Sequence, residues 1–91
     1  MLVLPERLTH GEASACMRML AQALRSDSGR EAVADASGLR EFDSSALAVL
    51  LECRREALAA GKHFAVHQLD PQLRALATLY GVDGLLPAAA L

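Results

Sequence analysis

The spacing of apolar and polar residues predicts three strands and three helices that alternate along the chain. The predicted strands cover residues 2–8, 31–37 and 63–69. The predicted helices cover about residues 9–24, 43–60 and 71–80. Pro5 restricts the first strand to the edge or the end of a sheet, because proline has no N–H to donate. Strands alternating with helices imply right-handed crossovers, so we predict an α/β fold with a largely parallel sheet.

Capping signals mark the ends of the predicted helices. Thr9 and Glu12 have the spacing of a capping box at the start of the first helix. Asp43 opens the second helix, and Asp70 caps the third, whose first residue is Pro71. The glycines expected just beyond the second and third helices are Gly61 and Gly81. The segments without a predicted element are residues 25–30, 38–42 and the apolar tail at 82–91.

Helical periodicity also separates core-facing positions from outward ones. In the first helix the core stripe is Ala13, Cys16, Met17, Leu20 and Leu24, and in the third it is Leu73, Leu76, Ala77 and Tyr80. In the second helix it is Ala46, Leu47, Leu50, Cys53, Ala57 and Leu58, with Val49 and Leu51 at the border. The outward positions of the second helix are Ser44, Ser45, Ala48, Glu52, Arg55 and Ala59. The outward side near the start of this helix is therefore less polar than usual.

Two serines in the first turn of the second helix are candidates for recognition or modification. Free backbone amides and the helix dipole favour negative charge at this position. A phosphate on Ser44 or Ser45 would be tolerated there, although the carboxylate of Asp43 would repel it. The alternative is that Asp43 and Ser44 only cap the helix, and the residues alone favour neither interpretation.

Composition narrows the class of protein. The chain has 91 residues, of which 53% are apolar but only 3% aromatic, so one domain covering residues 1–91 with an aliphatic core is expected. The longest unbroken apolar run has six residues, 46–51, against the ~20 that a membrane span needs. The N-terminus lacks the pattern of a signal peptide. With a net charge of −2 and no basic cluster, the chain is not expected to bind nucleic acid.

The residues that could carry chemistry do not form a recognisable catalytic or metal site. His63 and His67 would share a strand face about 13 Å apart, which is too far for one metal ion. Asp35 and Asp43 could be paired, but no general base lies beside a nucleophile in sequence. The two cysteines, Cys16 and Cys53, are expected to be reduced core thiols of a cytoplasmic protein. We therefore predict no catalysis, no metal and no cofactor.

Two segments, residues 33–39 and 42–50, resemble the STAS domain. The resemblance implies a mixed, mostly parallel β-sheet of about four strands flanked by about three to four α-helices. Residues 73–82, with Leu85-Leu86-Pro87 after them, look like the end of MlaB-type members, the STAS subunits of phospholipid-transport ABC systems. The Asp43-Ser44-Ser45 sequence is at least as similar to anti-sigma factor antagonists, which carry a phosphorylated serine in such a motif.

The MlaB-type resemblance implies a non-catalytic subunit that docks on the nucleotide-binding subunit of an Mla-type ABC transporter, which maintains outer-membrane lipid asymmetry. The partner-binding residues would then be Ser44, Ser45, Ala48, Leu51, Glu52 and Arg55. The protein would be cytoplasmic and peripheral to the inner membrane through its partner, without inserting into the membrane itself. The alternative is an anti-sigma factor antagonist that binds an anti-sigma factor Ser/Thr kinase and is switched by phosphorylation of Ser44 or Ser45.

Overall fold

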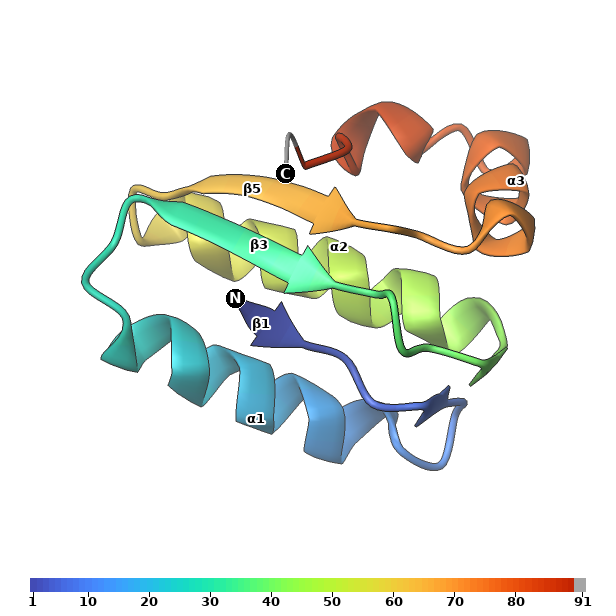
Figure 1. Ribbon diagram of the computed structural model, residues 1–91, viewed down its shortest axis with the longest axis horizontal. Coiled ribbons are helices and arrows are strands. Elements are labelled where there is room, and N and C mark those ends of the chain that lie inside the picture. The colour runs from blue at the N-terminus through green and yellow to red at the C-terminus, as the bar shows by residue number, and fades with distance from the viewer. Residues whose placement is uncertain (90–91) are drawn as a thin grey trace.

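A parallel three-stranded sheet forms the centre of the structure, a computed structural model that describes residues 1–89 (Figure 1). Its strands are β1 (Leu2–Val3), β3 (Glu31–Asp35) and β5 (His63–His67), in the order β1-β3-β5. A second, two-stranded parallel sheet joins β2 (Arg7–Leu8) to β4 (Glu41–Phe42). Together with the helices, this arrangement confirms the predicted α/β class with a mostly parallel sheet.

The helices lie mainly on one face of the central sheet. Right-handed crossovers lead from β1 through α1 (Ala13–Ser26) to β3, and from β3 through α2 (Ser44–Ala59) to β5. Two such crossovers in one direction place both helices on the same face, and Figure 1 shows α2 behind the strands. The remaining helices are α3 (Pro71–Leu79) and a 3₁₀ helix, η1 (Asp83–Leu85). In Figure 1, α3 lies beyond the carboxyl end of β5.

Strand alternation produces one buried and one open sheet face. On β3, Ala32 and Ala34 are buried whereas Val33 is only partly covered, and on β5 Phe64 and Val66 are buried. Because neighbouring residues of a strand point to opposite faces, the buried set is the one covered by α1 and α2. The core is almost wholly aliphatic, as the composition predicts. Its largest fully buried side chains are Leu8, Leu20, Leu39, Leu50, Leu73, Leu86, Val66 and Cys53.

Predicted caps at the later helices are confirmed by hydrogen bonds and backbone angles. The carboxylate of Asp70 accepts a hydrogen bond from the backbone N–H of Gln72 at 2.8 Å, and Pro71 is the first residue of α3. Gly61 and Gly81 follow α2 and α3 with φ angles of +75° and +74°. These left-handed conformations are open to glycine at little cost, so each glycine ends its helix where predicted.

The first predicted strand and the first helix start differ from expectation. The expected strand at residues 2–8 is broken at Pro5 into β1 and β2, which belong to different sheets. The capping-box prediction is wrong as a helix start, because α1 begins at Ala13. The side chain of Glu12 does accept hydrogen bonds from the N–H and hydroxyl of Thr9, at 2.9 and 2.7 Å. These bonds stabilise a turn that precedes the helix.

For three side chains the predicted burial is wrong. Leu58 is 46% exposed and Tyr80 is 58% exposed, although both were assigned to core stripes. Val49, expected at the border, is buried. Leu58 lies in the last turn of α2, and Tyr80 directly follows the last residue of α3. At the end of a helix fewer neighbouring side chains are available to cover a residue. The other residues of the three predicted stripes are buried or partly buried, as expected.

Two segments without predicted elements contribute to the fold. The expected connector at 38–42 contains β4, which pairs with β2. In the tail, Leu86 is fully buried, and the backbone of Val66 pairs with Pro87 and Ala89 at 2.8 and 2.9 Å. The tail therefore extends the central sheet beside β5. Residues 90–91 of the tail lie outside the described residues.

A buried lysine connects two loops at the amino end of the sheet. Lys62 is only 7% exposed, and its ammonium donates to the backbone carbonyl of Asp27 at 2.8 Å and to that of Gly29. Burial of a charged group is unfavourable unless hydrogen bonds compensate it, as the two carbonyls do here. Lys62 thus ties the loop after α1 to the residue that precedes β5.

Candidate functional site

The start of α2 is the best-defined polar site among the predicted functional residues. Asp43 is the N-cap, and its Oδ1 accepts a hydrogen bond from the backbone N–H of Ser45 at 2.8 Å. This bond, with weaker contributions from the N–H and charge of His10, holds the pKa of Asp43 below its ordinary value. The cap of α2 is therefore a carboxylate. The hydroxyl of Ser44, an exposed residue, does not perform this role.

The N-terminal segment of the chain holds this helix start in place. The second carboxylate oxygen of Asp43 accepts from the backbone N–H of His10 at 3.2 Å. The carbonyl of Glu6 accepts from the N–H groups of Arg40 and Glu41, at 2.7 and 3.0 Å. Together with the β2–β4 pair, these bonds connect the segment before α1 to the loop before α2. The first turn of α2 is thus positioned by residues more than 30 positions away in sequence.

The predicted partner-binding residues form a band along the outward side of α2. Ser44, Ala48 and Arg55 are exposed, and Ser45 and Glu52 are partly exposed. Leu51 is also partly buried, because it packs against the core from its border position. The outward side of α2 is defined here as Ser44, Ser45, Ala48, Leu51, Glu52 and Arg55. All six residues belong to α2, and the small, exposed Ala48 lies between the two serines and the Glu52–Arg55 pair.

Arg55 is held by two acidic neighbours on its own helix. Its Nε donates to Glu52 at 3.0 Å, its Nη2 also contacts Glu52, and Nη2 lies 3.5 Å from Glu56. The bidentate contact with Arg55 holds the pKa of Glu52 below its ordinary value and raises that of Arg55. Because the pairs are exposed, they contribute little to stability. Their effect is to orient a guanidinium on the outward side of the helix.

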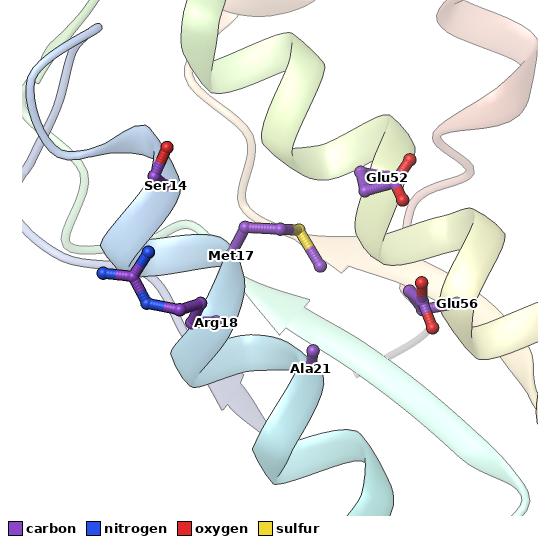
Figure 2. Close-up of a pocket in the computed structure, with 6 residues that line it drawn as sticks. All are labelled: Ser14, Met17, Arg18, Ala21, Glu52 and Glu56. Atoms are coloured by element: carbon purple, nitrogen blue, oxygen red, sulfur yellow. The ribbon is translucent and has the colours of Figure 1, made fainter.

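An open groove runs between α1 and α2 beside this surface. It has a volume of about 360 Å³ and is lined by Ser14, Met17, Arg18, Ala21, Glu52 and Glu56. Figure 2 shows the side chain of Met17 extending from α1 toward α2, across from the two glutamates. Sequence reasoning missed the α1 residues and Glu56, because no pattern within one helix reveals which face a second helix will approach.

The remaining candidates for chemistry are not assembled into an active site. Within residues 1–89, no three histidine, cysteine or carboxylate side chains form a group that could hold a metal ion. Asp35 does not pair with Asp43: its carboxylate accepts from Ser37, and this bonding lowers its pKa. Cys16 and Cys53 are buried and unbridged, and burial raises the pKa of Cys53 to about 11. Thiols of this kind are poor nucleophiles at neutral pH.

Across the described residues, no helix combines the length and the apolar character that crossing a membrane requires.

Family comparison agrees with the arrangement of elements. The family model described as "Mlab, STAS domain" matches residues 1–87, which is nearly the whole chain. Among functionally curated proteins, none matches this sequence.

Two solved structures show a closely similar fold. One is the crystal structure of a provisionally assigned anti-sigma factor antagonist from Thermotoga maritima, with a TM-score of 0.78 and 16% sequence identity; the match covers 94% of this chain and 75% of that one. The other is an anti-sigma-factor antagonist (STAS) domain protein from Planctomyces limnophilus, with a TM-score of 0.77, 19% identity, and coverage of 94% and 77%. At these identities the similarity establishes the fold alone.

Proposed function

Because this chain belongs to the STAS domain family, and the model that it matches is described as "Mlab, STAS domain", we propose that it is a non-catalytic, protein-binding subunit. Its partner is the nucleotide-binding subunit of an Mla-type ABC transporter for phospholipids, which it helps to assemble or regulate. The observation that carries the proposal is the outward side of α2, where Ser44, Ala48 and Arg55 are exposed while the opposite side of the helix is buried. This surface is the docking site.

Three physical features suit this surface to protein binding. The hydroxyl of Ser44 is free to donate or accept a hydrogen bond, because Asp43 caps the helix. Ala48 lets a partner approach closely, and burial of its methyl group costs no side-chain entropy. Arg55 is already oriented by Glu52 and Glu56, so less conformational freedom is lost when it binds. Arginine is also enriched at protein interfaces, and Arg55 supplies one at the edge of this surface.

The proposal places the chain at the cytoplasmic side of the inner membrane. Attachment there comes from the transporter subunit, and the chain itself does not enter the bilayer. The groove between α1 and α2 lies directly beside the docking surface, since Glu52 belongs to both. The partner therefore has an adjacent recess into which a side chain can extend.

Co-purification with the proposed partner tests the function directly. The tagged chain is co-expressed with the nucleotide-binding subunit of the Mla-type transporter from the same organism. We expect a stoichiometric complex that survives gel filtration and whose ATP hydrolysis differs from that of the nucleotide-binding subunit alone. Failure to form a complex, with the chain itself folded by circular dichroism, contradicts the proposal.

A second candidate function is an anti-sigma factor antagonist controlled by serine phosphorylation. It is favoured by the exposed Ser44, which lies in the first turn of α2 where the helix dipole stabilises added negative charge. The opposing effect is repulsion from the carboxylate of Asp43, whose oxygens are engaged by Ser45 and His10. In this alternative the partner is an anti-sigma factor Ser/Thr kinase that binds the same side of α2.

Intact-mass measurement separates the two functions. Protein isolated from growing cells would carry an additional mass of about 80 Da if it is a phospho-switched antagonist. The added mass should disappear in a Ser44→Ala, Ser45→Ala double variant. A single unmodified species in all growth phases, together with a stable complex with the ATPase, favours the transporter subunit.

A further inference from the structure

No helix within residues 1–89 covers the face of the central sheet opposite α1 and α2 (Figure 1). Strand alternation places Val33 of β3 and Ala65 of β5 at its centre, each only partly buried. At its β1 margin Val3 is 62% exposed. This open face therefore has an apolar centre, unlike the polar surface that usually covers the solvent side of a sheet.

Ionisable side chains flank that centre in a regular arrangement. The parallel register pairs Glu31 with His63 at the amino ends of β3 and β5, and Asp35 with His67 at their carboxyl ends. Each pair has its carboxylate on β3 and its imidazole on β5. Carboxylates accept hydrogen bonds only, whereas an imidazole has an N–H to donate in either protonation state. On the open face, the carboxylates that accept hydrogen bonds therefore lie on β3, and the imidazoles that donate them lie on β5.

This arrangement is complementary to itself under one two-fold rotation. If the axis runs parallel to the strands, midway between β3 and β5, then β3 of one copy lies over β5 of the other. Glu31 then faces the second copy's His63, Asp35 faces its His67, and Val33 packs on its Ala65. An axis that is parallel to the sheet plane but perpendicular to the strands would instead place Glu31 over the second copy's Asp35, and His63 over its His67. Like groups would then face each other.

We propose that the open face of the sheet binds a second copy of this chain, in an isologous dimer whose two-fold axis runs parallel to β3 and β5. The register of acid and imidazole residues selects this geometry, since only it pairs every acceptor with a donor. Val33 and Ala65 are small, so the two sheets can approach to the roughly 10 Å spacing of packed sheets.

The area of the open face limits the affinity of the dimer. Strands of five residues are about 17 Å long and lie about 4.8 Å apart. β3, β5 and the shorter β1 together offer much less than the roughly 800 Å² per partner that stable complexes bury. The dimer is therefore weak, and association is expected only in the range of tens to hundreds of micromolar. Because α2 lies behind the sheet, the docking surface proposed above stays accessible in the dimer.

Sedimentation equilibrium of the purified chain, from roughly 10 µM to 1 mM, tests the proposal. We expect a reversible monomer–dimer equilibrium in the wild type. Glu31→Lys should weaken it at least tenfold, because it places a cation over the second copy's imidazole. Adding His63→Glu to that variant restores complementarity and should restore the dimer. Gln22→Lys, an exposed change on α1 behind the sheet, is the control and should leave association unchanged.

Both tested positions are exposed, so the variants should fold, and thermal melting of each verifies this. A wild type that remains monomeric to 1 mM overturns the proposal. So does a Glu31→Lys variant that dimerises like the wild type, or a double variant that stays as weak as the single one. Equal weakening by Gln22→Lys would place self-association on the helical side instead.

Discussion

The two sides of α2 differ sharply in burial, although they belong to one continuous helix. On the inner side, Leu47 and Leu50 are buried against the sheet and α1, and packing there holds the domain together. On the outer side, Ala48 and Arg55 are exposed and contribute little to folding. Under the proposed function, stability and recognition are therefore separable within this helix. A substitution on one side should change folding, and a substitution one residue away should change binding.

The largest expected effect is loss of stability on the inner side. Leu50→Ala removes a side chain with no exposed surface and should lower the free energy of unfolding by about 2–5 kcal/mol. Leu58→Ala is the matched control: the same substitution in the same helix, at a 46% exposed position, should cost about 1 kcal/mol or less. Chemical denaturation of both variants provides the comparison. Equal losses would mean that Leu58 is packed after all.

The next effect is loss of binding on the outer side. Ala48→Arg should change the free energy of unfolding by only a few tenths of a kcal/mol, because arginine is a good helix former. In the complex, the bulky charge would separate the two surfaces or lose its hydration, and affinity should fall more than tenfold. Titration with the nucleotide-binding subunit measures this loss.

Ala75→Arg provides the matched control, since Ala75 is likewise an exposed helical alanine but belongs to α3. It should bind like the wild type. If Ala48→Arg also binds normally while melting normally, the docking surface lies elsewhere than on the outer side of α2.

The inner side of α2 was largely predictable from sequence and the surroundings of its outer side were not. Hydrophobic periodicity shows the direction of a side chain, and it placed Leu47, Leu50 and Cys53 correctly. It does not show how far the neighbouring elements extend. Leu58 lies in the last turn of α2 and Tyr80 follows the last residue of α3, and both side chains are exposed.

Contacts between segments that are distant in sequence were likewise not predictable from the sequence pattern. The β2–β4 pair has two residues per strand, which is too short for any periodicity, and it forms only when the two segments meet. Leu86 is a single anchor in an aperiodic tail. The groove beside Glu52 forms only where α1 packs against α2, and the residue pattern of α2 alone does not predict that contact. The cap at Asp43, by contrast, is a local signal, and it was predicted correctly.

A smaller effect is expected at the boundary between the two sides, where Asp43 caps the helix. Asp43→Ala should lower the melting temperature at pH 7 by roughly 3–8 °C, because the N–H groups of Ser45 and His10 lose their acceptor. Asp43→Asn keeps an acceptor and should lose less. Since folding lowers the pKa of Asp43, its stabilising effect is present above the ordinary value of 3.8 and is lost as pH falls through the lower folded-state pKa.

Melting curves at several pH values check this dependence. Other carboxylates with lowered pKa values, such as Glu12 and Asp35, also lose their stabilising effect in acid, so only the difference between wild type and Asp43→Ala is informative. That difference should be constant between pH 5 and 8 and should shrink below about pH 4. A difference that does not change in acid would show that the cap acts without its charge.

The smallest stability effect, and the sharpest separation of the two roles, is expected at Ser44. Because Asp43 supplies the cap, Ser44→Ala should change the free energy of unfolding by less than about 0.5 kcal/mol. Its effect on the complex should be larger than its effect on the fold, since a hydrogen bond lost at a desolvated interface leaves the partner's polar group unsatisfied. Ser44→Thr retains the hydroxyl and should bind more tightly than Ser44→Ala. Denaturation of the two variants measures the effect on stability, and titration with the partner measures the effect on binding. A Ser44→Ala protein that is destabilised by more than about 1 kcal/mol would show that this hydroxyl stabilises the fold and is not part of the docking surface.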